Sequence, residues 1–140
     1  MSLIDHSTEF GGRVVEHLRD EVVVWMTTVT PGGAPLPSPV WFMWDGEETA
    51  VIYSLPGARV RNIEANPRVT LNFGGNGKGG DIVVLSGRAA VADELRPAYA
   101  WPEYVEKYSS GFERLGMTPE GFSAKYSVPI VVKLTGLRGH

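Results

Sequence analysis

The chain carries PVWFMWDG at residues 39–46 and SLPGARVRNIEANP at residues 54–67. The first stretch is an aromatic strand that ends in Asp-Gly, a signal for a tight turn. The second stretch leaves another strand and opens into a short helix, which stops at Asn66 because proline disfavours helical geometry in the residue before it. Together the two stretches predict a strand, a turn, a second strand and a helix, and the rest of the fold extends from them.

The start of this short helix has the composition of an anion site. Free backbone N–H groups at a helix start and guanidinium groups beside it both attract negative charge, and a cofactor phosphate is the obvious candidate. Arg59 and Arg61 do not share a helix face, because they are two residues apart. One would reach the anion directly, and the other from the side or across a dimer. The alternative is that both are solvated, and that Asn62 only makes a local backbone hydrogen bond.

The aromatic strand has two different faces. Side chains alternate along a strand, so Phe42 and Trp44 share one face while Trp41 and Met43 share the other. We expect one pair to fill the interior of a barrel. The other pair would form a dimer contact or one wall of a cofactor cleft, with plain core packing as the alternative. Trp25, on the preceding strand, is expected in the core.

Elsewhere the sequence predicts short strands joined by turns and followed by a late helical passage. We expect a helix from Ser7 or Thr8 to Asp20, strands at residues 22–30, 35–44, 49–54, 68–73, 81–91 and 129–137, a glycine-rich loop at 74–80, and broken helices from 93 to 126. Six strands with one short crossover helix favour a mainly β protein, a small antiparallel barrel with flanking helices.

Composition excludes several classes of function. The 140 residues are enough for one core, so we expect a single domain over 1–140. The net charge of −3 gives no footprint for nucleic acid or an anionic membrane, and the absence of cysteine excludes thiol chemistry. The short apolar runs and the lack of a leader-like start predict a cytoplasmic protein.

No residue pattern identifies catalytic side chains. We find no nucleophile with a neighbouring base, no paired carboxylates and no metal-ligand spacing, so no catalytic residue and no metal ligand are nominated. This composition is consistent with hydride transfer, in which the cofactor supplies the chemistry and the protein positions it and excludes water.

Three groups of residues resemble a known family in their order and spacing. They are PVWF with DG at 39–46, RNI with NPRV at 61–69, and GDIVV with Gly87 at 80–87. With them, nearly the whole chain resembles the split-barrel flavin-binding proteins related to pyridoxamine 5′-phosphate oxidase. Within that family it is most similar to the deazaflavin (coenzyme F420)-dependent reductases.

This resemblance implies a six-stranded antiparallel split β-barrel that forms a homodimer, with a cofactor in each groove between the two barrels. It places the coenzyme F420 phosphate among Ser54, Ala58, Arg59, Arg61 and Asn62, the ring beside Pro39, Val40, Trp41 and Phe42, and the acidic tail of the cofactor near Lys78. Lys78 lies in the glycine-rich loop, and the alternative to a contact with the tail is that this lysine is simply solvated.

The function implied is reduction of an electron-poor small molecule, such as an enone or a quinone, by the reduced deazaflavin. An FMN-dependent oxidoreductase and a non-catalytic carrier of F420 or flavin are the alternatives. The sequence departs from the oxidase itself at residues 37–41, where that enzyme has a basic phosphate-binding strand, and at 134–138, where it has an arginine-bearing substrate motif. Oxidation of vitamin B6 is therefore not expected.

Overall fold

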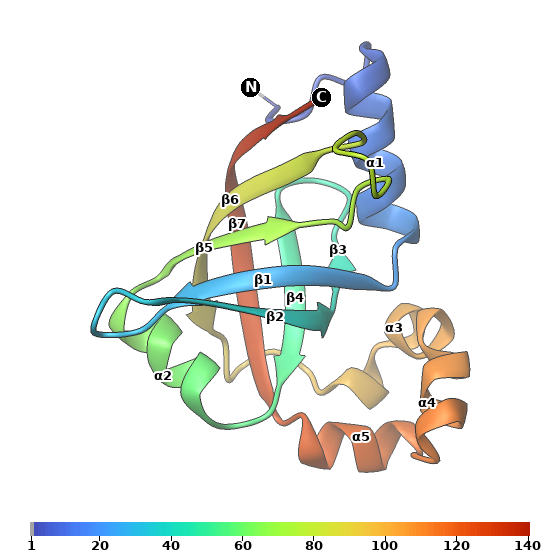
Figure 1. Cartoon of the computed structure of the whole chain (residues 1–140). Helices are drawn as coiled ribbons and strands as arrows, with labels where there is room; N and C mark the ends of the chain where they lie inside the picture. Colours follow the sequence, from blue (N-terminus) through green and yellow to red (C-terminus); the bar gives the residue numbers. More distant parts are fainter. Residues whose placement is uncertain (1) are drawn as a thin grey trace.

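A computed structural model describes residues 2–140 of the chain. Its strands form one antiparallel sheet in the order β2-β1-β5-β6-β7-β4-β3, which curls into a half-barrel (Figure 1). The elements are α1 (Glu9–Asp20), β1 (Val23–Val29), β2 (Pro35–Trp41), β3 (Met43–Trp44), β4 (Thr49–Ser54), α2 (Ala58–Ala65), β5 (Arg68–Asn72), β6 (Val83–Val91), the 3₁₀ helix η1 (Ala98–Ala100), α3 (Pro102–Lys107), α4 (Ser109–Leu115), α5 (Pro119–Lys125) and β7 (Val128–Gly139).

The prediction of six strands is wrong by one, because the expected strand at 35–44 is divided at Phe42. Its two parts, β2 and β3, stand at opposite ends of the strand order although they are consecutive in the chain. The Tyr108 hydroxyl accepts the Phe42 N–H at 2.8 Å, and the Lys107 ammonium donates to the Phe42 carbonyl at 3.0 Å. Helical side chains therefore satisfy the backbone where the ladder is interrupted.

The predicted alternation of the aromatic strand is confirmed. Phe42 and Trp44 belong to the cluster inside the barrel, whereas Trp41 and Met43 belong to a second cluster outside it. The prediction that Trp25 lies in the core is wrong, because this residue is 42% exposed. Val24 and Met26 take the inward positions of β1, so the residue between them points outward.

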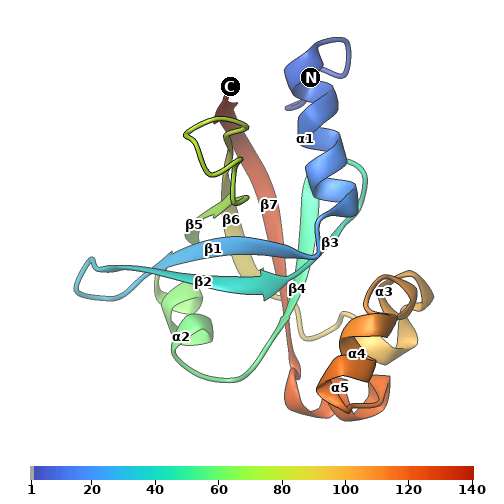
Figure 2. The ribbon, with the colours of Figure 1, turned by 45° about the vertical axis from the view of Figure 1, so that its right-hand side comes forward.

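The late helices cover one side of the barrel. Figure 2 shows α3, α4 and α5 gathered beside the ends of β4 and β7 that lie farthest from α1. The second cluster fills the space between these helices and the sheet, with Tyr104, Tyr108, Phe112 and Phe122 all buried. Trp41 reaches into this cluster from the end of β2. None of the helices in residues 2–140 is long and apolar enough to span a membrane.

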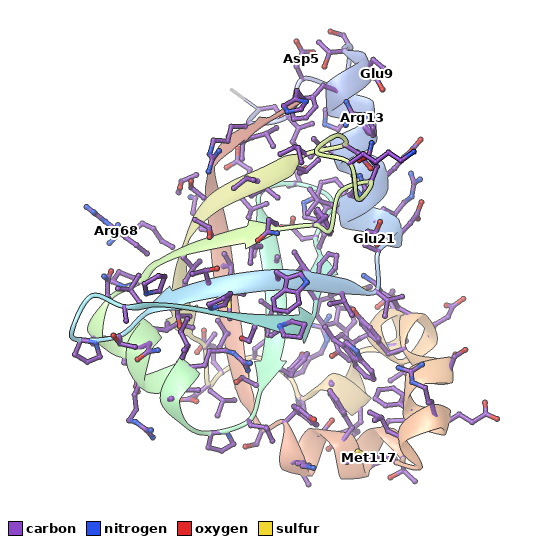
Figure 3. The ribbon with its side chains drawn as sticks, in the orientation of Figure 1. Asp5, Glu9, Arg13, Glu21, Arg68 and Met117 are labelled. Atoms are coloured by element: carbon purple, nitrogen blue, oxygen red, sulfur yellow. The ribbon has the colours of Figure 1, made fainter. Side chains whose placement is uncertain are left out.

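The first helix begins as predicted, with Thr8 as its N-cap accepting the Gly11 N–H at 2.9 Å. Figure 3 shows charged side chains along this helix, among them Glu9 and Arg13. Arg13 donates to Asp81 at 2.8 Å, and His17 lies 3.0 Å from Asp81 through Nε2 and 3.0 Å from Glu21 through Nδ1. Asp81 precedes β6, so these contacts fix α1 to the loop between β5 and β6.

We expect the contribution of His17 to stability to depend on pH. Burial lowers the pKa of His17, but the hydrogen bonds to Asp81 and Glu21 outweigh it and raise the pKa above 6.5. Because the folded pKa exceeds the unfolded one, this contribution is complete below about pH 6.5 and is lost as the pH rises through the folded pKa. Urea unfolding of wild type and His17→Gln should therefore show a larger difference in unfolding free energy at pH 5.5 than at pH 8.5. Equal differences at both pH values would contradict a charged His17.

Candidate cofactor cavity

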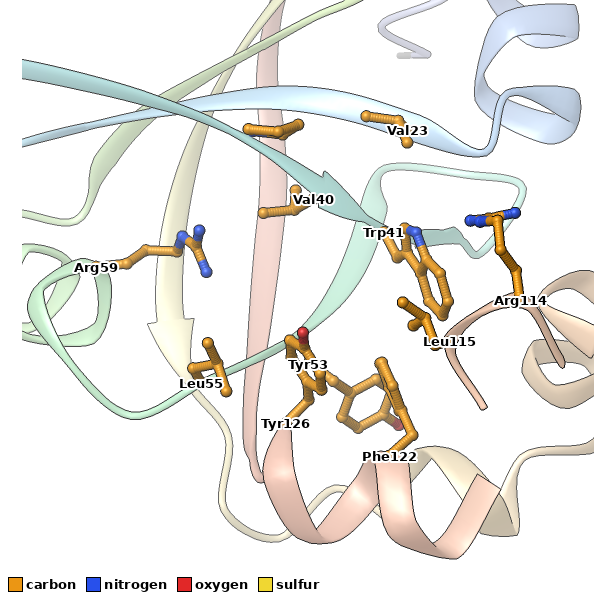
Figure 4. A pocket seen from close by; sticks show the side chains of 11 residues that line it. Val23, Val40, Trp41, Tyr53, Leu55, Arg59, Arg114, Leu115, Phe122 and Tyr126 are labelled. Carbon is orange, nitrogen blue, oxygen red and sulfur yellow. The ribbon is translucent and has the colours of Figure 1, made fainter. Parts of the chain in front are cut away.

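A cavity of about 380 Å³ lies between the ends of β2 and β4 and the helices α2, α4 and α5 (Figure 4). This volume is within the range of small-molecule and cofactor sites. Its wall is formed by Val23, Pro39, Val40, Trp41, Tyr53, Leu55, Arg59, Arg114, Leu115, Phe122 and Tyr126. Among residues 2–140, no aspartate, glutamate or histidine contributes to this wall.

Stacked aromatic rings make one side of the cavity apolar and rigid. The Trp41 ring stacks between Tyr108 at 4.3 Å and Phe122 at 5.2 Å, measured between ring centroids. Phe122 stacks in turn on Tyr126 at 4.4 Å. The Tyr53 hydroxyl donates to the carbonyl of Arg96 at 2.8 Å, which fixes that ring against the helical segment. The faces of Trp41 and Phe122 are covered by their stacking neighbours, so these two rings give the wall apolar contact surface and rigidity.

Arg59 provides a positive charge at one end of the cavity. Its guanidinium donates to the Ser38 hydroxyl from Nη2 at 2.9 Å and from Nε at 3.3 Å, and to the Ser54 hydroxyl from Nη1 at 2.9 Å. Three of the five N–H groups are thus used, which leaves two free. Both partners are neutral, and no carboxylate within residues 2–140 forms an ion pair with Arg59. Burial lowers the pKa of Arg59 from its ordinary value.

The start of α2 adds backbone donors beside Arg59. Gly57 precedes the helix with a φ of 147°, a conformation that favours glycine, and no side chain caps the helix there. The first N–H groups of a helix have no partner within the helix. The guanidinium, which has no carboxylate partner within residues 2–140, and these N–H groups are donors that could hold a phosphate or another anion.

The structure brings together only some of the residues predicted for the site. The cavity is lined by Pro39, Val40, Trp41 and Arg59. Ser54 does not line it, but its hydroxyl accepts a hydrogen bond from Arg59. Phe42 does not line the cavity, because alternation along the strand turns its side chain into the barrel interior.

The other predicted residues lie outside the cavity of one chain. Asn62 is buried, and its amide donates to the Thr28 hydroxyl at 3.1 Å, so it connects α2 to β1. Ala58 and Arg61 are exposed on α2, which separates the two arginines as their spacing predicts. Lys78 is exposed on the β5–β6 loop, at the end of the barrel where α1 lies (Figure 1). Contacts of Arg61 with a cofactor, from the side or across a dimer, and of Lys78 with its acidic tail stay predictions.

Several residues of the site are missing from the sequence prediction. Ser38 holds Arg59, and the late helices supply Arg114, Leu115, Phe122 and Tyr126. The spacing of Phe122 and Tyr126, four residues apart, places them on one helix face, which is a sequence signal for a shared surface. Nothing in the sequence indicates that this surface faces the end of β2.

A half-barrel with flanking helices and an aromatic-walled cavity that has a cationic end is the architecture expected of a split-barrel flavin-binding protein. A family profile described as pyridoxamine 5′-phosphate oxidase matches residues 10–132. The chain therefore belongs to the pyridoxamine 5′-phosphate oxidase-like family of split-barrel flavin-binding proteins.

Solved structures of differing function share this fold. An F420 reductase is 23% identical with a TM-score of 0.63, over 88% of this chain and 94% of that chain. A FAD-binding protein from Mesorhizobium loti is 18% identical with a TM-score of 0.63, over 89% and 87%. HutZ, a heme storage protein from Vibrio cholerae, is 19% identical with a TM-score of 0.58, over 99% and 95%. At such identities the likeness concerns the fold alone. Among curated proteins, none matches the chain.

Gly111 on α4 permits the close approach of Trp41. A Cβ atom added at Gly111 would lie 2.6 Å from Cη2 of Trp41, closer than real Cβ contacts allow, and the stacked neighbours of Trp41 prevent its ring from sliding away. We expect Gly111→Ala to destabilise the protein by about 1–3 kcal/mol through overpacking. Chemical unfolding followed by tryptophan fluorescence measures this change.

Gly12→Ala is the matched control for Gly111→Ala. Gly12 also lies inside a helix, but nothing lies within 4 Å of an added Cβ. The exchange should stabilise the protein by up to about 1 kcal/mol, because alanine is the better helix former. If Gly111→Ala were as harmless as Gly12→Ala, the close contact between α4 and Trp41 would be wrong.

Proposed function

We propose that this protein is a coenzyme F420-dependent reductase, which transfers hydride from the reduced deazaflavin to an electron-poor small molecule such as an enone or a quinone. The observation that carries the proposal is the half-buried guanidinium of Arg59, which has no carboxylate partner in residues 2–140 and stands at the end of an aromatic-walled cavity. Family membership and the sequence resemblance support the choice of a tricyclic cofactor with a phosphate.

The residues present fit such a cofactor. The two free N–H groups of Arg59 and the first N–H groups of α2 would hold the phosphate, and Ser38 and Ser54 would fix the direction of the guanidinium. The β2 backbone at Pro39–Trp41 would run beside the ring. When bound, the reduced cofactor supplies the hydride. Trp41, Phe122 and Leu55 would exclude water from the reacting faces, which strengthens the electrostatic interactions there.

No side chain is assigned as a catalytic acid or base. The cavity wall contains the hydroxyl of Tyr126 and that of Tyr53, and the latter is already bound to a carbonyl. Positioning of the ring against the substrate is therefore the contribution that these residues make to the reaction.

We also propose that two copies of the chain form a homodimer through the outer face of β1 and β2. Trp25 and Val23 are 42% and 39% exposed on that face, and the exposed prolines Pro39 and Pro37 lie opposite Trp25 and Thr27 in the strand pairing. A continuous exposed apolar face is typical of an interface. Val23 and Pro39 also line the cavity, so a second copy on this face would close part of its rim.

The test is a titration of the purified protein with F420 and, separately, with FMN, followed by tryptophan fluorescence. Trp41 in the cavity wall should respond to either ligand, and we expect tighter binding of F420. Reduced F420 with a panel of enones and quinones should then give turnover of at least one acceptor. Tight binding of FMN without affinity for F420 would contradict the proposal and favour an FMN-dependent oxidoreductase. F420 binding without any turnover would favour a carrier.

A further inference from the structure

The cavity has a second positive group, Arg114, far from the first. Arg59 enters from α2, whereas Arg114 comes from the last turn of α4. Figure 4 shows the two side chains at opposite sides of the cavity, with Trp41, Tyr53 and Phe122 between them. The cavity thus has a cation at each end and an aromatic middle.

Neither arginine forms an ion pair with an acidic side chain in the described part of the chain, residues 2–140. The cavity wall within residues 2–140 has no acidic side chain, and Arg114 forms no salt bridge with any of those residues. Arg114 and Leu115 are both exposed at the rim, so a ligand can reach the guanidinium without displacing a protein partner. Clefts lined by charge of one sign attract ligands of the opposite sign.

We propose that Arg114 binds a carboxylate of the acceptor, so that the substrates are electron-poor small molecules that carry a carboxylate. This inference rests on the proposed function, because the phosphate at Arg59 and the ring beside β2 leave Arg114 for a different group. The acidic tail of F420 is attached through the phosphate and extends away from the ring, so it does not reach the side of the cavity where Arg114 lies. An acceptor bound beside the ring can place a carboxylate there. A carboxylate presents the planar pair of oxygens that an arginine binds with two parallel hydrogen bonds.

The experiment compares Arg114→Ala with wild type in two arms. The first arm measures the dissociation constants of F420, which has an acidic tail, and of FMN, which has a phosphate and no such tail. The second arm loads the protein with oxidised F420, which cannot donate hydride, and measures binding of cinnamaldehyde and of 4-carboxycinnamaldehyde by calorimetry. These two aldehydes differ only by the carboxylate.

Each arm has its own expected result. In the first arm, Arg114→Ala leaves the dissociation constants of F420 and FMN unchanged, because Arg114 does not contact the cofactor. In the second arm, the variant weakens the binding of 4-carboxycinnamaldehyde about fivefold and leaves that of cinnamaldehyde unchanged. Fivefold is the upper end for an ion pair at an exposed position. Arg88→Ala is the matched control, since it removes one charge at an exposed site on β6 and should change none of the four constants.

Unchanged constants in both arms would overturn the role of Arg114. Equal weakening of the charged and neutral aldehydes would also overturn it, because the loss would then reflect packing. Arg59→Ala, measured beside it, separates this inference from the proposed function. If Arg59→Ala leaves the dissociation constants of both F420 and FMN unchanged, the proposed phosphate site is wrong, independently of the result for Arg114→Ala. If Arg59→Ala weakens the binding of both cofactors and Arg114→Ala does not weaken that of 4-carboxycinnamaldehyde, only the role of Arg114 is wrong.

Discussion

Arg59→Ala should weaken the binding of F420 by about 1.5–3 kcal/mol, the contribution of a hydrogen bond to a charged group, which corresponds to about 10- to 150-fold in the dissociation constant. The effect is large because the guanidinium is half-buried, is already oriented by Ser38 and Ser54, and has no carboxylate within residues 2–140 to compete with the ligand. Fluorescence titration of the variant at constant ionic strength measures the loss.

Two further variants show whether the geometry of Arg59 or only its charge is needed. Arg59→Lys keeps the charge but loses the planar fork that reaches two serines and a phosphate at once, so it should recover only part of the affinity. Arg61→Ala removes the same charge from the exposed side of α2, and we expect a loss below about threefold. Unchanged affinity in Arg59→Ala would mean that the phosphate does not bind at the start of α2.

The sequence predicts most of the strands well because their signals are local. The strand at 49–54 agrees with β4 to the residue, and α1 is capped by Thr8, one of the two residues expected there, and ends at Asp20 as predicted. The division at Phe42 is different, because the hydroxyl that accepts the Phe42 N–H belongs to Tyr108, 66 residues away. Periodicity within residues 35–44 contains no information about that contact. Trp25 shows the same limit, since alternation fixes its face relative to Val24 but not which face is inside.

The predictions for the site succeed and fail for the same reason, because some of its contacts are local in the sequence and others are not. Ser54 and Arg59 lie five residues apart, so the anion site at the start of α2 follows from a short stretch of sequence. Ser38 contacts Arg59 from β2, and Arg114 lines the opposite side of the cavity from α4, so only the fold brings these residues to one site. The arginine at the start of α2 could be predicted for that reason, whereas the helical wall and the second arginine required the structure.

The second large effect is on stability and concerns the buried Tyr108, for which the buried Tyr104 is the matched control. Both side chains are almost fully buried, at 1% and 0% exposure. The Tyr108 hydroxyl accepts the Phe42 N–H at 2.8 Å and lies within donating distance of the Val22 carbonyl at 2.7 Å. The Tyr104 hydroxyl has no hydrogen-bond partner within residues 2–140. The same chemical change therefore removes a hydrogen-bonded group at one position and an unpaired one at the other.

We expect Tyr108→Phe to lower the free energy of unfolding by about 1–3 kcal/mol, because it leaves the buried Phe42 N–H without an acceptor at the point where the ladder is interrupted. Tyr104→Phe should be neutral or stabilising, since it relieves the cost of burying an unpaired hydroxyl. Urea midpoints of both variants measure the difference, and unchanged slopes confirm that unfolding stays two-state. A loss at Tyr104 equal to that at Tyr108 would contradict an unpaired Tyr104 hydroxyl, and an unchanged unfolding free energy in Tyr108→Phe would contradict the hydrogen bond from the Phe42 N–H to Tyr108.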